Sequence, residues 1–268
     1  MEIHIGSSSY ISQFLSKKNN SIVKISSKKE KNSIKTDYKN LSFLKKIIIN
    51  QKIDYVIIFL GKNFKGKSKK KSFYINYELP LKVLNYLTKV NKSKLKIIFF
   101  GTYLEDEYRT SKNNLDYKRD KINLRNQVKL LSKKSKFEFV WLKLPLVYGK
   151  DQFNKNFTSI LIKNINMNNT INIQNKFNTL YLLNIYDVCR LIFLIKKKWH
   201  IYKNKVIAPK AEGPFFIYEL INMITKKTKL NFDVVYKNLK RKKKIRIKKN
   251  LINYKIKNNF INFLLKNV

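Results

Sequence analysis

The stretch "GTYLEDEYRTSKNNLDYKRDK", residues 101–121, contains side chains whose types and spacing could transfer a proton. Tyr108 and Tyr117 are each followed four residues later by a lysine, a spacing that puts both side chains on one face of a helix. A nearby ammonium lowers the pKa of a phenol, which can then give or take a proton closer to neutral pH. The pattern therefore predicts acid/base catalysis by one Tyr/Lys pair.

The neighbouring sequence has to identify which Tyr/Lys pair is catalytic, because this chain is rich in both residue types. With 16 tyrosines, and with 53 lysines beside 6 arginines, about three such pairs are expected by chance, and three occur, the third running from Tyr236 to Lys240. Tyr117 begins a long helical pattern and Thr102 follows a strand-like run, so Thr102, Tyr117 and Lys121 are the predicted catalytic residues. Tyr108 is rejected because it lies in a polar loop with no helix to fix its lysine.

The first half of the chain alternates short apolar runs with amphipathic ones. Strands are predicted at 2–6, 21–26, 54–61, 95–101 and 137–145, and helices at 10–18, 41–52, 75–90 and 117–134. This alternation predicts an α/β fold, a Rossmann-type doubly wound parallel sheet, in which ligands bind at the carboxyl ends of the strands. Residues 1–149 are the predicted dinucleotide-binding domain.

The pattern loosens after Gly149, where residues 150–268 are predicted to form a smaller C-terminal substrate-binding lobe, interleaved with the first domain. Helices are expected at 156–168, 185–199 and 215–229, with a strand at 205–210 and a turn at "AEGP". The run "KNLKRKKKIRIKKN", residues 237–250, is predicted to be a solvated segment, with a polyanion contact as the alternative.

The first strand-to-helix junction, "GSSSYIS" at residues 6–12, could hold a pyrophosphate. A dinucleotide fold places glycines there so that the backbone can turn sharply and approach the anion. Only Gly6 is a glycine, and serines stand at the further positions, so the predicted cofactor contacts are Gly6, Ser9, Tyr10, Ile11 and Ser12. A plain strand–helix turn is the alternative.

The end of the second predicted strand indicates which dinucleotide would fit. An acidic residue there binds a ribose 2′-hydroxyl and repels a 2′-phosphate, whereas this chain has Ser26, Ser27, Lys28 and Lys29. Ser27 and Lys28 are therefore predicted cofactor contacts. NADP is favoured over NAD.

The amino-acid composition indicates whether nucleic acid, a metal ion or a membrane is an expected binding partner. The formal net charge of +43 would suit nucleic acid, but lysine is spread along the whole chain and arginine is scarce, so a solvated surface is predicted and nucleic acid is the minority alternative. One cysteine excludes an internal disulfide, and His4 and His200 are too few for a zinc cluster, so no metal is predicted. The apolar run 181–195 is short and carries charges, so a soluble cytoplasmic protein without a membrane span is expected.

These residues, taken in order, resemble the extended short-chain dehydrogenase/reductase family, the NAD-dependent epimerase/dehydratase group that acts on nucleotide sugars. The similar segments are "GSSSYIS", "YVIIFLG", "FFGTY", "YKRDK", "LKLPLVYG", "LNIYDVCRLIFLI" and "AEGPFFIYELINMI". The order of the seven segments carries the resemblance.

The resemblance implies roles for residues at matching positions. Tyr117 would be the acid/base, Lys121 its partner and a ribose ligand, and Thr102 the hydroxyl that orients the substrate. Pro145 and Tyr148 would flank the nicotinamide, with core packing as the alternative for Tyr148. The substrate would be a nucleotide-linked sugar, with epimerisation, dehydration and reduction all left open, and with a homodimer through 121–131 as a guess. A family member that binds dinucleotide or a partner without turnover is the competing reading, because two glycines are replaced.

Overall fold

The computed structural model describes residues 1–17, 21–29, 32–48, 51–64, 66, 68–91, 93–107, 111–150, 156–228, 232–237, 251–252 and 254–267. By its contacts the chain divides into two compact units, one of residues Met1–Leu144 and Leu194–Ala208 and one of Pro145–Phe193 and Pro209–Val268. Tyr108, Lys240 and nearly all of the basic run 237–250 lie outside the described residues.

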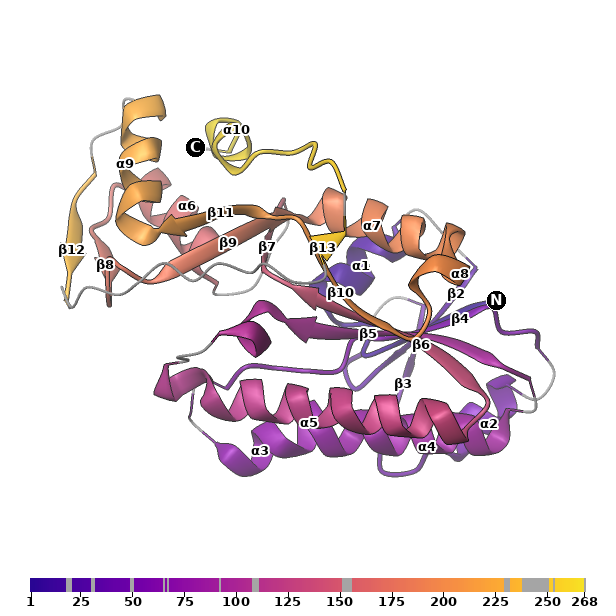
Figure 1. The fold of residues 1–268 in the computed structure, drawn as a ribbon. Coiled ribbons are helices and arrows are strands. Elements are labelled where there is room, and N and C mark those ends of the chain that lie inside the picture. Colours follow the sequence, from indigo (N-terminus) through magenta and orange to yellow (C-terminus); the bar gives the residue numbers. More distant parts are fainter. Residues whose placement is uncertain are drawn as a thin grey trace. The chain divides into compact units, whose positions relative to one another are not determined.

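The first unit is built on a parallel sheet of seven strands in the order β3-β2-β1-β4-β5-β6-β10 (Figure 1). The strands are β1 (Glu2–Ile5), β2 (Ile22–Ser26), β3 (Ser33–Lys35), β4 (Tyr55–Ile58), β5 (Leu95–Thr102), β6 (Phe137–Leu144) and β10 (Lys205–Pro209). The strand order reverses direction between β1 and β4, and ligands bind beside such a switch point in α/β sheets. The predicted doubly wound Rossmann-type fold is confirmed.

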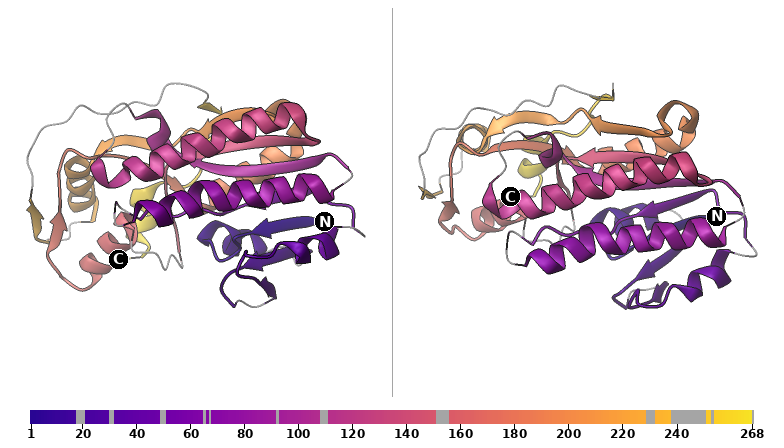
Figure 2. Two further views of the ribbon diagram at one scale, coloured as in Figure 1. Left: turned by 90° about the horizontal axis from the view of Figure 1, so that it is seen from below. Right: turned by 60° about the horizontal axis from the view of Figure 1, so that its bottom comes forward.

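Helices cover both faces of this sheet. They are α1 (Tyr10–Ser16), α2 (Ser42–Ile48), α3 (Lys69–Phe73), η1 (Tyr74–Glu78), α4 (Leu79–Val90), η2 (Tyr103–Asp106), α5 (Lys112–Lys134) and α8 (Trp199–Tyr202). In both views of Figure 2, α4 and α5 run side by side along one face, and Figure 1 shows α1 on the opposite face. The alternation along β1 follows from this layering: Ile3 and Ile5 enter the core under the long helices, whereas His4 points toward α1.

The second unit has a different plan, with two small sheets. Strands β7 (Leu146–Tyr148), β9 (Thr179–Asn184) and β11 (Glu212–Phe216) form one sheet, and β8 (Ile171–Ile173) and β12 (Val234–Tyr236) form the other. The short strand β13 (Leu251–Ile252) belongs to neither of them. Its helices are α6 (Phe157–Asn166), α9 (Ile217–Thr228) and α10 (Phe260–Leu265), and α7 (Ile185–Lys197) begins in this unit. The core gathers Tyr148, Leu161, Leu220 and Phe260.

Two predicted boundaries are wrong. The helix expected to begin at Tyr117 begins at Lys112, so Tyr117 lies in its second turn, after Ser111 at the N-cap position. The turn expected at "AEGP" is part of β11, which pairs with β9 through an irregular register between Glu212 and Phe215. Gly213 has φ +105, a conformation that glycine adopts easily, and so allows this irregular pairing. The same glycine, next to a proline, is also typical of a turn, which is why a turn was predicted there.

Candidate functional site

Gly6 lies where β1 ends, at the point where the strand order of the sheet reverses. Its φ is +80, and a Cβ there would come within 3.2 Å of the backbone of Phe59 and Leu60 at the end of β4. A glycine is therefore required both by conformation and by space. The close approach links the predicted cofactor turn directly to the segment that follows β4.

The serines of the turn have different surroundings. Ser9 is the N-cap of α1 and accepts a hydrogen bond from the Ser12 amide at 3.2 Å. Ser12 is fully buried, with its Oγ 2.8 Å from His4 Nδ1. Tyr10 and Ile11 form the first turn of the helix and are half-buried. The Ser12 side chain thus packs the helix onto the sheet, while Gly6, Ser9, Tyr10 and Ile11 remain at the turn.

His4, on β1, is a fully buried core histidine. Its Nε2 lies 2.7 Å from Glu2 Oε1, and Lys196 donates to the other Glu2 oxygen at 2.6 Å. Burial lowers the pKa of His4 below its ordinary value, so the imidazole is neutral at pH 7. A neutral ring that donates a hydrogen bond to Glu2 through Nε2 can accept one from the Ser12 hydroxyl at Nδ1. This hydrogen bond explains how a serine fits this position.

Tyr38, which sequence reasoning missed, reaches the same turn from the segment after β3. Its hydroxyl accepts from the Gly6 amide at 3.1 Å and donates to the Ile25 carbonyl at 3.1 Å. At the end of β2 nearby, Ser27 and Lys28 are exposed, and the Lys28 amide is bonded to the Ser26 hydroxyl at 3.1 Å. Both predicted contacts therefore face solvent.

Thr102 ends β5 and caps the short helix η2. Its hydroxyl oxygen accepts from the Leu104 amide at 3.3 Å, which leaves the hydroxyl proton to donate, and its own amide donates to Glu105 at 2.9 Å. Thr102 and Glu105 form a capping box, whose Thr-x-x-Glu signal is present in "TYLE" and would have identified Glu105 from the sequence.

Glu105 is the buried carboxylate of the site. It also accepts from Trp141 Nε1 at 3.1 Å and pairs with Arg125 at 2.6 Å. Burial raises the pKa of Glu105 above its ordinary value, although the Arg125 guanidinium and the hydrogen bonds act in the opposite direction. Arg125 is on α5 and Trp141 on β6, so this one side chain ties three elements together at the end of β5.

Gly101 makes room for this cluster and gives a stability prediction. A Cβ at Gly101 would lie 2.2 Å from both Glu105 Oε1 and Trp141 Nε1, closer than any atoms tolerate. Gly101→Ala is therefore expected to lower the free energy of unfolding by at least about 2 kcal/mol, because buried polar groups lose their partners. Urea unfolding at pH 7 measures the change.

The matched control for this prediction is Gly66→Ala. Its Cβ would meet nothing closer than 3.5 Å, so it carries only the strain of a positive φ, of about 1 kcal/mol. Equal losses in the two variants would show that the contact at Gly101 does not matter.

Tyr117 and Lys121 lie one turn apart on α5, as the spacing predicts. Lys121 is only 3% exposed; its ammonium donates to the Leu60 carbonyl at 3.1 Å and lies 6.0 Å from the centre of the Tyr117 ring. Tyr117 is half-buried, and within the described part of the chain its hydroxyl has no hydrogen bond. The phenol can therefore bond to a reacting oxygen without first giving up a partner.

The protonation of the pair differs from the prediction. Burial, and secondarily the negative charge of Glu105, raise the pKa of Tyr117 above its ordinary value, so the predicted lowering is wrong. Burial lowers the pKa of Lys121 to about 8, with Glu105 acting in the opposite direction. At pH 7 the site thus holds a protonated phenol and a lysine that is mostly an ammonium, an arrangement suited to donating a proton.

Pro145 and Tyr148, predicted beside the nicotinamide, begin the second unit. Pro145 lies between β6 and β7, half-buried. The Tyr148 ring is fully buried against Phe260, at 4.9 Å between ring centres, and its hydroxyl donates to Glu212 at 2.7 Å. These contacts give Tyr148 a packing role in the core of its own unit.

Asp187, the acidic residue of the segment "LNIYDVCRLIFLI", is fully buried at the start of α7. Its carboxylate accepts from the amide of Asn258 at 3.1 Å and from the Tyr254 hydroxyl at 3.1 Å, and it pairs with Arg190. It therefore fastens the segment before α10 to α7 within the second unit.

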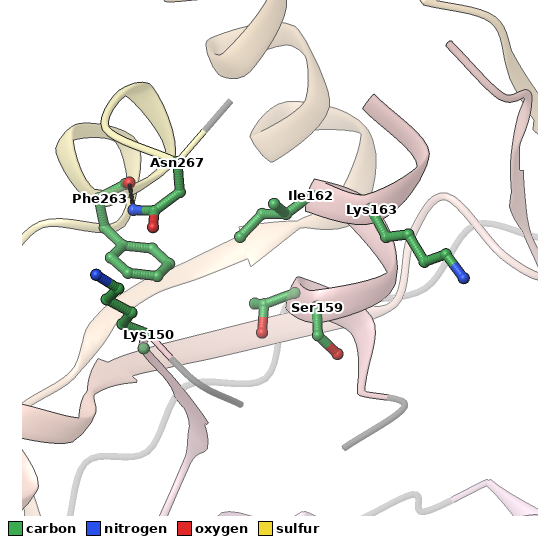
Figure 3. Close-up of a pocket in the computed structure, with 8 residues that line it drawn as sticks. Lys150, Ser159, Ile162, Lys163, Phe263 and Asn267 are labelled. Atoms are coloured by element: carbon green, nitrogen blue, oxygen red, sulfur yellow. Dashed lines mark hydrogen bonds between the residues drawn. The ribbon is translucent and has the colours of Figure 1, made fainter. Parts of the chain in front are cut away.

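The second unit contains a cavity of about 240 Å³, drawn in Figure 3. Lys150, Ser159, Ile162 and Phe263 are among its lining side chains, and the Lys163 side chain points away from the others. A cavity of this size is smaller than sites that enclose a whole drug-sized ligand, so it could hold only part of one.

No group of three or more His, Cys, Asp or Glu side chains in the described part of the chain is placed to bind a metal ion. None of the described helices combines the length and the apolar character needed to cross a bilayer.

Comparison with known proteins gives a family match and structural neighbours. The family model described as "NAD dependent epimerase/dehydratase family" matches residues 6–204. UDP-glucose 4-epimerase from Thermotoga maritima, solved with UDP-glucose, is similar at 15% identity and TM-score 0.79, over 100% of this chain and 97% of that one. UDP-glucuronic acid 4-epimerase from Bacillus cereus, solved with NAD, has 16% identity and TM-score 0.77, over 100% and 95%.

A third neighbour was solved with the other nicotinamide dinucleotide. RMD from Pseudomonas aeruginosa, complexed with NADPH, has 12% identity and TM-score 0.75, over 98% of this chain and 96% of that one. No curated protein sequence matches this chain.

Proposed function

Because this chain belongs to the NAD dependent epimerase/dehydratase family, we propose that it catalyses a keto–hydroxyl oxidoreduction on a nucleotide-linked sugar with a nicotinamide dinucleotide. The observation that carries the proposal is the pairing of a half-buried phenol with a buried ammonium, Tyr117 and Lys121, beside the Thr102–Glu105 capping box. Leu60 connects this site to the Gly6 turn, because its backbone lies close to Gly6 and its carbonyl accepts a hydrogen bond from Lys121. Structural neighbours solved with UDP-sugars and with NAD or NADPH support the same class of reaction.

The chain's residues fit a dinucleotide at the Gly6 turn, where any side chain would collide with the end of β4. Gly6, Ser9, Tyr10 and Ile11 would hold the pyrophosphate, and the Ser12 side chain would support the turn through His4. Lys121 would bind the nicotinamide ribose, and Pro145 would flank the ring. When bound, the cofactor supplies or accepts the hydride.

The exposed pair at the end of β2 supports NADP as the preferred form. Ser27 and Lys28 can give a 2′-phosphate a hydroxyl and an ammonium. No acidic side chain stands at either position to repel that phosphate. A preference for NADP would therefore come from the attraction of its 2′-phosphate to these two solvent-exposed side chains.

Proton transfer is assigned to Tyr117. Its raised pKa keeps the phenol protonated at neutral pH, so it would donate its proton to the oxygen of a sugar carbonyl that becomes a hydroxyl. Thr102 would donate a hydrogen bond to the same oxygen, and the Lys121 cation would stabilise negative charge that develops there. Reduction of a keto sugar requires this step, and so does the return of a keto intermediate to a hydroxyl in epimerisation.

A binding module without turnover is the second candidate. The replacement of two glycines by Ser9 and Ser12 favours it, because each added Cβ takes space in the turn. The complete set of Thr102, Tyr117 and Lys121 favours the enzyme.

The test is a titration of the protein with NADPH and NADH, followed by fluorescence, and then assays with UDP-glucose, UDP-glucuronic acid and other nucleotide sugars. Binding of a dinucleotide together with turnover of a sugar is the expected result, with tighter binding of NADPH. Binding without turnover of any sugar would favour the module. Absence of binding to both dinucleotides would overturn the oxidoreductase proposal.

A further inference from the structure

The position of Lys121 depends on residues 60–62, in the segment that follows β4. The ammonium donates to the Leu60 carbonyl at 3.1 Å, and a Cβ on Gly61 would lie 2.6 Å from Lys121 Nζ. The backbone of residues 60–61 therefore accepts a hydrogen bond from the ammonium and also packs directly against it. Any shift of this segment would change where the cation lies and how much water reaches it.

A buried amide holds the segment at Lys62. The Lys62 amide donates to Asn76 Oδ1 at 2.8 Å, and Asn76 Nδ2 donates to the Lys62 carbonyl at 2.9 Å. Asn76 is fully buried in η1, a π-helical turn between α3 and α4. Such turns are frequent at functional sites because they turn a side chain out of the regular helical ladder.

Ser72 connects this amide to α5. Asn76 Nδ2 donates to Ser72 Oγ at 3.2 Å, and the Ser72 hydroxyl donates to Asp120 Oδ2 at 2.7 Å. The direction of both bonds is fixed, because a carboxylate only accepts and a hydroxyl has one proton. Ser72 is 2% exposed and Asp120 is fully buried.

Asp120 precedes Lys121 in sequence, so the contacts form a closed ring. It runs from Lys121 through Leu60, Lys62, Asn76, Ser72 and Asp120 and returns to Lys121. The Asn76–Ser72 and Ser72–Asp120 bonds are buried, where water competes little with each bond, whereas the bonds to the backbone of Leu60 and Lys62 are partly buried.

We propose that Asp120 and Ser72 are positioning residues that hold the Leu60–Lys62 backbone, and through it the Lys121 ammonium, in the place that catalysis requires. The proposal rests on the proposed function, in which Lys121 assists proton transfer by Tyr117. Neither Asp120 nor Ser72 has to touch substrate or cofactor.

The charges near Lys121 define what a change in this network would do. Glu105 on η2, itself paired with Arg125, favours the charged lysine, and the Tyr117 phenol faces it from the same helix. Asp120 is adjacent in sequence, and its second oxygen is paired with the Arg119 guanidinium at 3.1 Å. Breaking the Ser72 bond leaves all these charges in place, so its effect would come from loosening the backbone and admitting water.

The experiment compares Ser72→Ala with wild type in two measurements. With nucleotide sugar and NADPH, kcat is expected to fall about tenfold or more while both KM values stay within about twofold, because the loss is one of positioning. Independently of activity, the pH dependence of unfolding is measured for each protein and for its Lys121→Met derivative. The difference within each pair reports the pKa of Lys121, which is expected to rise above about 8 in Ser72→Ala as water reaches the ammonium.

Ser132→Ala is the matched control, because it removes a hydroxyl from the exposed face of α5, where the hydroxyl bonds only to Lys129. It is expected to leave kcat and the pKa of Lys121 unchanged. An unchanged pKa of Lys121 in Ser72→Ala would overturn the positioning role, even if Ser72→Ala were less stable. A shifted pKa in a protein that turns over no sugar would instead uphold the network and reject the proposed function.

Discussion

Tyr117→Phe is expected to lower kcat by about a thousandfold while the affinity for the dinucleotide stays within about threefold. The substitution removes one oxygen from a half-buried ring whose hydroxyl has no hydrogen bond in the described part of the chain, so neither packing nor a buried partner is lost. Only the proton that the phenol would donate disappears. Fluorescence titration with NADPH and steady-state turnover of a UDP-sugar measure the two quantities.

Tyr86→Phe is the control, since it removes a phenol hydroxyl from α4 in the same unit. It should keep wild-type turnover. A Tyr117→Phe protein with more than about a tenth of the wild-type kcat would show that another group transfers the proton.

The pH profile separates the two members of the pair. The pKa of Tyr117 is raised above its ordinary value, so the phenol does not titrate between pH 6 and pH 9. Lys121 loses its proton near pH 8. Activity should therefore decline as pH rises through about 8, because the phenol is still present but the cation that stabilises the developing charge is lost.

The buried strands were predictable because each of them is a short apolar run. All four residues of β1 and all eight of β6 are buried, and their sequences read as strands without any knowledge of neighbours. The short strands β3, β8 and β12 were missed because three residues give no usable period. The second unit depends on such strands, so its two small sheets could not be drawn from the sequence.

The catalytic spacing was predictable, whereas the polar groups around it were not. Tyr117 and Lys121 share a helix, so local periodicity places them together. Ser72 and Asp120 are 48 residues apart and meet only because α3 packs against α5. The pKa of Tyr117 was predicted in the wrong direction for the same reason, because burial and the charge of Glu105, which come from tertiary packing, raise it.

The scarce acidic residues are concentrated in the described interior more than the net charge of +43 would suggest. The chain has 16 of them, and five, Glu2, Glu105, Asp120, Glu138 and Asp187, are buried among the described residues. Each is bonded to a lysine, an arginine or a serine hydroxyl inside its own unit. Among the described residues only two lysines, Lys121 and Lys143, are buried, so the other described lysines lie at least partly at the surface.

Lys121→Met is expected to abolish most turnover and, at pH 7, to make the protein more stable. The ammonium ionises at about 8 in the folded protein and at 10.5 in the unfolded chain, so burial of the charge disfavours folding at pH 7 by about 3 kcal/mol. Methionine has a similar shape and no charge to desolvate. Under the proposed function, Lys121 opposes folding but serves the reaction, a trade-off between stability and activity that is common at active sites.

The sign of the pH dependence makes this prediction specific. Between pH 8 and pH 10.5 the unfolded chain binds more protons than the folded protein, so wild type gains stability as pH rises and the advantage of Lys121→Met shrinks. Urea unfolding at pH 7, 9 and 10.5 measures the difference. Lys129→Met, at an exposed site on the same helix, should differ from wild type by the same small amount at each pH. A constant difference for Lys121→Met as well would mean that the ammonium is hydrated in the folded protein, and the raised pKa of its buried neighbour Tyr117 would then have to be revised with it.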